Sequence, residues 1–422
     1  MTQEIKQRIE QIKKGKVPAG YKKSKLGIVS SEWENTSFST LFTTTSDFTE
    51  DNAKYPLYSL TIENGITAKT ERYERSFLVK KNNSYKIMQP NDFAYNPMNI
   101  RFGAVARHKG TKAVSVSGYY DIFTTVNQSD LQFMDDFLSS DLMLTYYNKQ
   151  STGSLIEKKR VHFSQFLDFN LPLPPLSERK KIAEILSTQD KVIELQQKRI
   201  DELKKLKKAY LNKMFPQKES NVPELRFKGF TGNWEQRKLG DIVGIYDGVH
   251  QTPNYQDSGV MFLSVENIAT LKSSKFISEE DFKRDYKVYP QENDILMTRI
   301  GDVGTTNVVT DNGLKAYYVS LALLKYKKTD PYFLSNAIQS DFVQKGLANR
   351  TLKTAVPMKI NKDEIGKVDV MLPVSPEEQH QIGSYFQNLD NLITLQSRKL
   401  DAEKLKKKSL MQLLLTGIVR VK

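Results

Sequence analysis

The sequence contains no cysteine. This absence excludes disulfides, thiolate nucleophiles, iron–sulfur clusters and cysteine-based zinc sites, and it fits a reducing compartment. Histidine is scarce: His108, His162, His250 and His380 are the four in the chain, and no two have the spacing of a paired-ligand motif such as HExxH. We therefore expect no metal site in this chain.

Long apolar runs are also missing. Residues 1–16 are charged throughout and lack the apolar core of a signal peptide, and no stretch approaches the roughly 20 apolar residues of a membrane-spanning helix. These absences predict a cytoplasmic protein with no membrane partner.

The signatures of an enzyme are missing as well. There is no GxxxxGK[ST] phosphate loop, and the glycine-rich segment 299–304 lacks the lysine and the strand-to-helix context of one, so a turn between strands is the simpler interpretation. Residues 96–99, Asn-Pro-Met-Asn, only faintly resemble the motif of amino-methyltransferases, because the second proline and the stacking aromatic residue are absent. No Ser-His-Asp or paired-carboxylate pattern stands out. We expect a chain without catalytic residues.

Positive charge is abundant. The 422 residues include 63 Lys and Arg against 49 Asp and Glu, a net charge of +14, and the isoelectric point is near 9.4. Such an excess favours polyanionic partners, and nucleic acid is the leading class. The hydrophobic fraction of 39% and the aromatic fraction of 10% are too high for a disordered basic tail. The length predicts a folded protein of about two to three domains.

The chain contains an internal repeat. Segment Leu171–Pro216 aligns with segment Met371–Thr416 at an offset of 200 without a gap. Identical residues occupy equivalent positions, among them Glu178 with Glu378, Ile182 with Ile382, Asp190 with Asp390, Ile193 with Ile393, Gln196 with Gln396, Asp201 with Asp401, and Lys207 with Lys407. A repeat on this scale indicates that the fold itself is duplicated.

The regions before these segments match more weakly. Trp33-Glu34 corresponds to Trp234-Glu235, Leu60–Asn64 to Leu263–Asn267, and Asn91-Asp92 to Asn293-Asp294. Between these points the two halves differ almost everywhere. We therefore predict four segments: a first variable domain with an N-terminal arm (1–170), a first helix (171–216), a second variable domain (217–370) and a second helix (371–422).

Each repeated segment has the pattern of a long amphipathic helix. Apolar residues recur every 3.5 residues in the same heptad register in both copies, with a glutamine at the same d position in the middle of each. Matched registers favour packing of the two helices against each other, although packing of each helix on its own domain remains an alternative. The residues that we expect to form this packing are Ile182, Leu186, Ile193, Gln196, Ile200, Leu203, Ile382, Phe386, Leu389, Ile393, Gln396 and Leu400.

The variable regions are predicted to mix strands and helices. Short β-branched and aromatic runs at 57–62, 121–126, 260–265 and 316–326 are typical of strands, whereas 133–147 and 332–344 have the pattern of helices. The fold class expected is α+β, a tandem duplication of a mixed domain followed by a long helix, with the two helices packing as an antiparallel coiled coil.

Basic, aromatic and amide-bearing loops are the candidates for DNA contact. Residues 101–112 carry four formal positive charges and one histidine without an acid, and residues 247–255 form a polar loop. Lys and Arg can hold phosphates or read guanine edges, although a solvated basic face or a plain surface turn is the alternative for each. The candidates are Lys69, Arg72, Arg101, Arg107, His108, Lys109, Lys112, Tyr119, Tyr246, His250, Gln251, Thr252, Asn254, Tyr255, Arg299 and Thr305.

Several of these segments resemble a known family, the specificity subunits of type I restriction–modification systems. Pro172–Ala183, PLPPLSERKKIA, is similar to the entry into that family's conserved helix, and Leu372–Gly383 is a second copy that departs at Val374-Ser375 and Gly383. Segments 248–253 and 293–301 resemble its target-recognition domains. The resemblance covers essentially the whole chain.

This resemblance implies a non-catalytic subunit in which each recognition domain reads one half of a bipartite, asymmetric site on double-stranded DNA. The helices would set the spacer and dock two modification subunits, which carry S-adenosylmethionine and methylate adenine. Restriction subunits with ATP and magnesium would join them, and this chain would bind no cofactor itself. The alternatives are a coiled-coil scaffold that binds DNA without sequence preference, or a stand-alone methyltransferase or nuclease.

Overall fold

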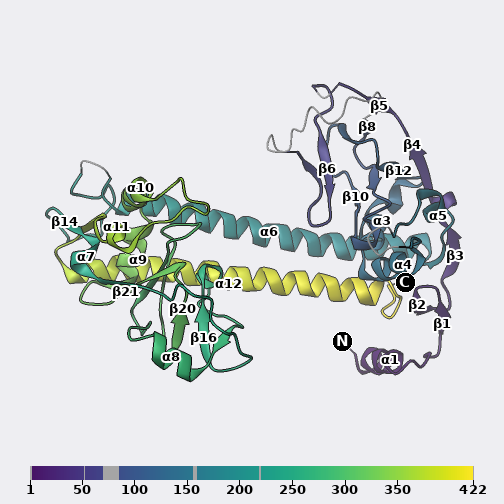
Figure 1. Ribbon diagram of the computed structural model, residues 1–422. Coiled ribbons are helices and arrows are strands. Elements are labelled where there is room, and N and C mark those ends of the chain that lie inside the picture. The colour runs from purple at the N-terminus through teal and green to yellow at the C-terminus, as the bar shows by residue number, and fades with distance from the viewer. Residues whose placement is uncertain (1, 52, 70–84, 155–158, 218–219, 422) are drawn as a thin grey trace. The chain divides into compact units, whose positions relative to one another are not determined.

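The computed structural model describes residues 2–51, 53–69, 85–154, 159–217 and 220–421 (Figure 1). The chain divides into two compact units: unit 1 comprises Met1–Leu195 and Leu400–Lys422, and unit 2 comprises Gln196–Lys399. Each unit combines a domain of helices and strands with parts of two long helices, α6 (Leu176–Met214) and α12 (Pro376–Leu414). The expected fold class is confirmed: a duplicated α+β domain, each copy followed by a long helix.

In unit 1 the strands form small antiparallel sheets. The largest has the order β10-β9-β12-β4, a second has the order β11-β8-β5, and the pairs β1-β2, β6-β7 and β13-β3 complete the set. The elements of this unit before α6 are α1 (Gln3–Lys13), β1 (Tyr21–Ser24), β2 (Gly27–Ser30), β3 (Glu34–Ser37), α2 (Phe38–Leu41), β4 (Phe42–Thr45), β5 (Phe48–Thr49), β6 (Tyr58–Thr61), β7 (Gly65–Ala68), β8 (Tyr85–Met88), β9 (Phe93–Tyr95), η2 (Ile100–Phe102), β10 (Val105–Arg107), β11 (Val114–Ser117), β12 (Asp121–Thr125), η3 (Gln128–Asp130), α3 (Leu131–Leu138), α4 (Asp141–Gln150), α5 (Phe163–Leu167) and β13 (Asn170–Leu173).

Unit 2 repeats this plan. Its four-stranded sheet has the order β19-β18-β21-β15, and its three-stranded sheet has the order β17-β16-β20, in which β16 and β20 run parallel. The elements between the two long helices are β14 (Glu235–Lys238), α7 (Leu239–Ile242), β15 (Gly244–Asp247), β16 (Val260–Leu263), η5 (Val265–Asn267), β17 (Phe276–Ile277), α8 (Glu279–Asp285), β18 (Ile295–Thr298), β19 (Thr306–Val308), β20 (Lys315–Tyr317), β21 (Leu321–Lys325), α9 (Pro331–Gln339), α10 (Asp341–Arg350), α11 (Lys362–Gly366) and β22 (Asp369–Leu372).

The weak sequence matches between the halves mark equivalent turns. Asn91 and Asn293 both have positive φ, 73° and 71°, a conformation that Asn tolerates better than most residues. The side chain of the following aspartate then closes the turn, because Asp92 accepts from the Gln89 N–H and Asp294 from the Gln291 N–H, each at 2.8 Å. The same short motif thus leads into β9 and β18.

Two segments expected to be single helices are each two helices. Segment 133–147 is divided into α3 and α4 at Ser140, and segment 332–344 into α9 and α10 at Ser340. Ser140 is extended, with φ −71° and ψ 152°, and its hydroxyl accepts from the Met143 N–H, so it acts as the N-cap of a new helix. The expected strand 316–326 is likewise two strands, β20 and β21, joined by a turn.

The two long helices contact each other within each unit. In unit 2, Gln196 Nε2 donates to Gln396 Oε1 at 2.6 Å, and Lys207 Nζ lies 2.7 Å from Asp390 Oδ1. Moving forward along α6 therefore means moving backward along α12, which is the antiparallel arrangement. In unit 1, Gln189 Nε2 donates to Glu403 Oε2 at 2.6 Å.

The helices also enter the cores of the domains. In unit 1 the buried side chains of Ile182 and Leu186 belong to the same core as Trp33 and Leu414, and in unit 2 Ile382 and Phe386 belong to the same core as Trp234. Both modes of packing are therefore present: one part of each long helix packs on a domain, and another part packs against the other long helix. Ile200, Leu389, Gln396 and Leu400 are buried, and Ile193, Leu203, Gln196 and Ile393 are half-buried.

A buried glutamate at the start of each long helix holds the segment that follows the other helix. Arg420, beyond the end of α12, donates to both oxygens of Glu178 at 2.7 and 2.8 Å. Arg226, beyond the end of α6, donates to both oxygens of Glu378 at 2.6 and 2.8 Å. Two parallel charge-assisted bonds fix both the position and the orientation of each guanidinium.

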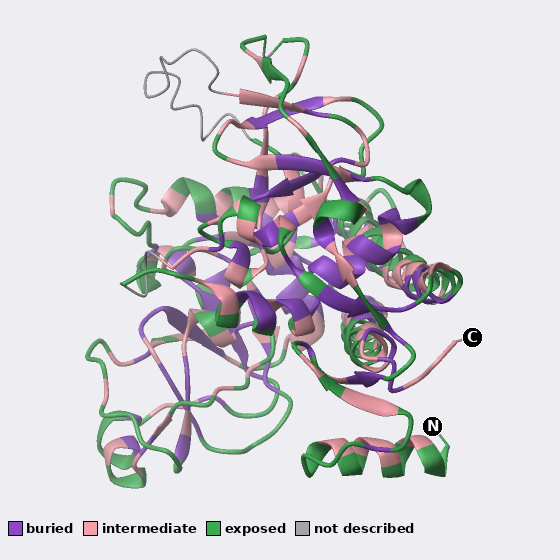
Figure 2. Ribbon diagram, turned by 90° about the vertical axis from the view of Figure 1, so that its right-hand side faces the viewer, coloured by how far each residue is buried: buried purple, intermediate pink, exposed green. Residues whose placement is uncertain are grey.

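The N-terminal arm contacts the same tail in unit 1. Arg8 of α1 donates to the Ile418 carbonyl oxygen at 2.6 Å, and the Tyr21 hydroxyl donates to the Gly417 carbonyl oxygen at 2.8 Å. Helix α1 itself contains no buried residue, as the exposed and intermediate colours beside the N-terminus in Figure 2 show.

Candidate nucleic-acid interface

The basic segment of unit 1 spans η2, β10 and the loop that follows. Two of its members are used inside the fold. Arg107 donates to Asn91 Oδ1 at 2.9 Å and to Gln132 Oε1 at 2.7 Å. His108 is buried, and its Nε2 lies 2.8 Å from the Lys112 carbonyl oxygen. These two side chains shape the loop that carries their neighbours.

The neighbouring cations are accessible. Lys109 is 64% exposed although its Nζ lies 2.8 Å from Asp135 Oδ2, and Lys69 and Lys112 are exposed. The Arg101 guanidinium lies 4.5 Å from the centre of the exposed Phe102 ring, a cation–π contact. Tyr119 is exposed as well. Exposed ammonium groups can hold phosphates, and exposed aromatic rings can stack on bases.

Arg72 was also expected to contact DNA. It lies outside the described residues.

In unit 2 the candidate loop follows β15, and a glycine sets its path. A Cβ at Gly248 would lie 2.3 Å from the Tyr317 carbonyl oxygen, so only glycine allows the two backbone segments to approach this closely. Beyond it, four side chains with hydrogen-bonding groups are exposed: His250, Gln251, Thr252 and Asn254. Amide and hydroxyl groups of this kind are suited to base edges in the major groove.

Two tyrosines flank this loop. Tyr246 on β15 is exposed. The Tyr255 ring is exposed on one side and packs at 5.5 Å from Phe262 on the other, and Lys275 Nζ lies 5.3 Å from its centre. Lys275 was not anticipated from the sequence, because its proximity to Tyr255 arises only from the pairing of β16 with β17.

Arg299 and Thr305 make internal contacts. Arg299 is buried and forms an ion pair with Asp247, the last residue of β15, and burial lowers the pKa of its guanidinium. Thr305 is half-buried, and its hydroxyl donates to Asp302 Oδ2 at 2.6 Å. Arg299 thus joins the end of β18 to the base of the 248–255 loop and positions it.

Unit 2 also contains a groove that sequence reasoning missed. It has a volume of about 730 Å³ and lies between β19, α9 and the long helices, with Lys272, Lys315 and Arg398 among its lining residues. These cations are far apart in the sequence and occur in no common motif, so only the fold brings them together.

Two lysines that are identical in the two copies of the repeat also have specific partners. Lys207 pairs with Asp390 in unit 2, and Lys407 pairs with Asp190 and with the buried Asp136 in unit 1. Their identity in both copies was the available signal, since an identical charge on an otherwise divergent helix face indicates a specific partner.

The described residues contain neither a metal-binding cluster nor a membrane-spanning helix. Within the ranges given above, no group of three or more His, Asp or Glu side chains is arranged to hold a metal ion. In the same part of the chain, no helix has the length and apolar character required to cross a bilayer.

Comparisons with known proteins agree with these features. The model of the type I restriction modification DNA specificity domain matches residues 31–205 and again residues 231–404. The type I restriction enzyme MjaVIII specificity subunit of Methanocaldococcus jannaschii is 28% identical over 314 residues, which cover 69% of this chain and 72% of that protein.

Two solved structures have a similar fold. The S subunit of a type I restriction–modification system from M. genitalium gives a TM-score of 0.57 at 15% identity, covering 91% of this chain and 96% of that one. A chain from a study of complex assembly and conformational transition of the type I R-M system gives a TM-score of 0.53 at 16% identity, covering 96% of this chain and all of that one.

Proposed function

Because the chain belongs to the type I restriction modification DNA specificity family, we propose that each of its two units reads one half of a bipartite DNA site. The observation that carries this proposal is the duplication of a recognition domain with its long helix, while the candidate contact loops differ between the copies, lying around β10 in unit 1 and after β15 in unit 2. Similar frames present similar surfaces, whereas different loops read different bases, so the two half-sites should differ in sequence.

Direct contact is assigned to the exposed candidates and to Arg101, which is half-buried beside the exposed Phe102. In unit 1 these are Lys69, Arg101, Lys109, Lys112 and Tyr119, and in unit 2 they are Tyr246, His250, Gln251, Thr252, Asn254 and Tyr255. Lysine and arginine contacts to phosphate hold the protein on the duplex, and the amide and hydroxyl groups read base edges. Arg107, His108, Arg299 and Thr305 act through the loops they hold, and Arg72 is assigned from its charge alone.

The paired helices supply the distance between the half-sites and the surface for other subunits. Each helix spans 39 residues, which corresponds to about 58 Å at about 1.5 Å per residue. Two copies of one helical surface suit two copies of one partner. The partners proposed are two modification subunits carrying S-adenosylmethionine, joined by restriction subunits that use ATP and magnesium, and the setting is the cytoplasm.

The test is a map of adenine methylation across the genome of cells that express this chain with the modification subunit of its own locus. Cells that lack this chain are the control. The expected result is one new motif with two short specified blocks around an unspecified spacer. The absence of new methylation, in a complex shown to assemble and to bind S-adenosylmethionine, would contradict the proposal and favour a scaffold that binds DNA without reading its sequence.

A further inference from the structure

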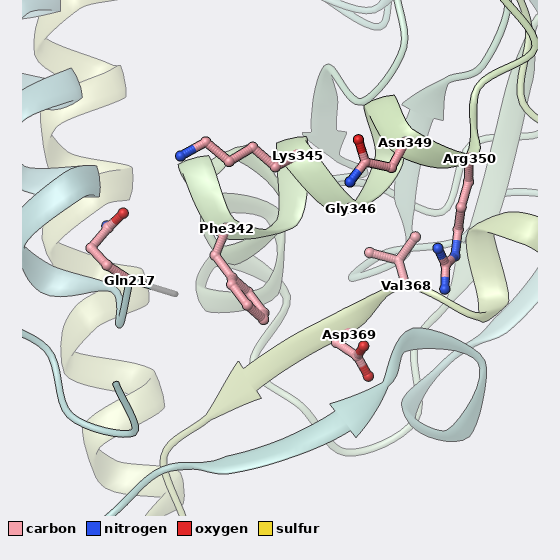
Figure 3. Close-up of a pocket in the computed structure, with 8 residues that line it drawn as sticks. All are labelled: Gln217, Phe342, Lys345, Gly346, Asn349, Arg350, Val368 and Asp369. Carbon is pink, nitrogen blue, oxygen red and sulfur yellow. The ribbon is translucent and has the colours of Figure 1, made fainter. Parts of the chain in front are cut away.

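Unit 2 has a cavity where unit 1 has a tyrosine. The cavity has a volume of about 260 Å³ and lies between α10 and the start of β22 (Figure 3). Its floor is formed by Phe342 and Gly346 of α10 and by Val368.

Helix α10 corresponds to α4 residue by residue. Both helices have ten residues, and each begins after an extended serine, Ser340 or Ser140, at an offset of 200. Gly346 therefore corresponds to Tyr146.

Backbone hydrogen bonds identify the unit 1 residue that is equivalent to Val368. The Leu239 N–H donates to the Val368 carbonyl oxygen at 2.9 Å in unit 2, and the Phe38 N–H donates to the Phe169 carbonyl oxygen at 2.8 Å in unit 1. Val368 and Phe169 are each followed directly by the equivalent strand, β22 or β13. Val368 therefore corresponds to Phe169.

In unit 1 the two equivalent residues are aromatic and in contact. The rings of Tyr146 and Phe169 lie 4.9 Å apart at an angle of 76°, and both are buried. In unit 2 a Cβ on Gly346 would point at Val368 at 3.0 Å, so the two positions face each other there as well. Two rings are thus replaced by a hydrogen atom and an isopropyl group, and the cavity is the space that remains.

The size of the cavity suits one aromatic ring. An apolar cavity of about 150 Å³ accepts benzene in other proteins, so a phenol ring fits this volume. Figure 3 shows the Phe342 side chain and Val368 bordering the space, with Lys345, Asn349 and Arg350 along α10. The environment is therefore an apolar floor with polar groups along one side.

The rim carries two cations, Lys345 and Arg350, and one carboxylate, Asp369. Lys345 is exposed, and the Nε of Arg350 is buried without a hydrogen-bond partner. The carboxylates close to this rim already have cations of their own: Asp369 lies 2.6 Å from Lys238 Nζ, and Glu364 lies 2.6 Å from Lys367 Nζ. A ligand with negative charge beside its ring would pair with Lys345 and with the outer nitrogens of Arg350.

We propose that this cavity is a docking site for a tyrosine side chain flanked by acidic residues on a partner protein. The partner's ring occupies the place that Tyr146 occupies in unit 1, and its acidic neighbours pair with Lys345 and Arg350. Among the described residues, Tyr146 and Phe169 fill the equivalent place in unit 1, so the site distinguishes the two otherwise similar units. A partner that docks here binds once per chain.

The first experiment tests the cavity with 4-methylphenol, the side chain of tyrosine alone, titrated into the full chain in a calorimeter. We expect one site with a dissociation constant on the order of 1 mM, since a ligand of so few atoms makes little contact area. The double variant Gly346→Tyr/Val368→Phe rebuilds the aromatic pair of unit 1 and should abolish binding while the melting temperature is kept. Absence of saturable binding to the wild type, or equal binding to this variant, would overturn the proposal.

The matched variant reverses the exchange in unit 1. Tyr146→Gly/Phe169→Val should create a second site, so that two molecules of 4-methylphenol bind per chain. If this variant does not fold, the unit 2 variant still decides the question, because it adds side chains to an existing cavity. A folded unit 1 variant with one site only would contradict the equivalence on which the proposal rests.

The second experiment tests the partner's chemistry with three blocked peptides: Glu-Tyr-Glu, Lys-Tyr-Lys and Glu-Ala-Glu. The first should bind at least five-fold more tightly than the others, and Lys345→Glu should remove this preference. Equal binding of the three peptides would overturn the assignment of an acidic tyrosine segment. No DNA or methyltransferase is needed, so failure here is separate from failure of the proposed DNA recognition.

Discussion

At the scale of single residues, Glu378 shows how a buried carboxylate can hold two distant segments together. It is almost fully buried and receives two hydrogen bonds from Arg226. Glu378→Gln removes the counter-charge of the half-buried Arg226 and weakens both hydrogen bonds, and we expect the free energy of unfolding of unit 2 to fall by roughly 1.5 to 3 kcal/mol. Urea denaturation followed by circular dichroism measures this loss.

The neighbouring residue provides the control. Glu377 is exposed and lies in the same first turn of α12, so Glu377→Gln should change stability by less than about 0.5 kcal/mol. Equal losses in the two variants would mean that the helix terminus, and not the Arg226 pair, is responsible.

Asp136 provides a pH-dependent test. Burial raises the pKa of its carboxyl above the usual 3.8 by more than the nearby Lys407 lowers it. The folded state then binds the proton more tightly than the unfolded state, so this residue's contribution to stability falls as pH rises from about 3.8 through the folded-state pKa. Asn, which unit 2 has at the equivalent position 336, does not titrate.

The test compares the wild type with Asp136→Asn by urea denaturation. The pH values run from about 3.5 to about 6 in steps of about half a unit. The stability of the wild type relative to the variant should decrease with rising pH over this window. A relative stability that increases with pH would mean that the ion pair with Lys407 outweighs burial.

At the scale of secondary-structure elements, the glutamine pair between α6 and α12 is the clearest target. Gln196 Nε2 donates to both the side-chain and the backbone oxygen of Gln396. Gln196→Leu leaves the buried Gln396 side chain without its partner, and we expect a loss of about 1 to 3 kcal/mol. The double variant Gln196→Leu/Gln396→Leu forms an apolar layer and should recover that loss, giving a coupling energy of about 1 kcal/mol or more.

The control for this cycle is Gln197→Leu, because Gln197 is exposed and bonds to Asp201 on its own helix. Additive effects of Gln196→Leu and Gln396→Leu would show that the pair is not coupled.

The sequence predicted these long helices well because their signal is repeated along many turns and in two copies. Short elements were less predictable. The division of segment 133–147 depends on one capping serine, and apolar residues continue on both sides of it, so periodicity alone does not reveal the break.

The residues that contact DNA were difficult to predict for a different reason. Arg107 and Lys109 are both cations of one segment, yet Arg107 is bonded to Asn91 and Gln132 whereas Lys109 is exposed. The groups that these two cations contact are distant from them in the sequence, and Gln132 lies on helix α3. Charge pattern therefore predicts where cations gather, but the fold decides which of them remain available to DNA.

At the scale of the whole molecule, the two recognition domains should be exchangeable separately. Replacing segment 238–370 by the equivalent segment of another family member should change one half of the methylated motif and leave the other half unchanged. The reason is that this segment lies within unit 2 and contains the whole of its recognition loop. Methylation mapping measures the result, and a change in both halves would contradict independent reading.

The reverse exchange is the matched control. Replacing segment 36–170 should change the other half alone, because these residues belong to unit 1. Two chimeras that alter the same half would mean that one domain reads the entire site.

The composition of unit 1 also has a consequence for synthesis on the ribosome. Its core includes Leu414 and Leu415, and its buried Glu178 is paired with Arg420, so residues translated early depend on residues translated after the whole of unit 2. Unit 2 is continuous in the chain, from Gln196 to Lys399. We expect unit 2 to fold first, while unit 1 remains partly open, with apolar surface exposed, until residues 400–422 have left the ribosome.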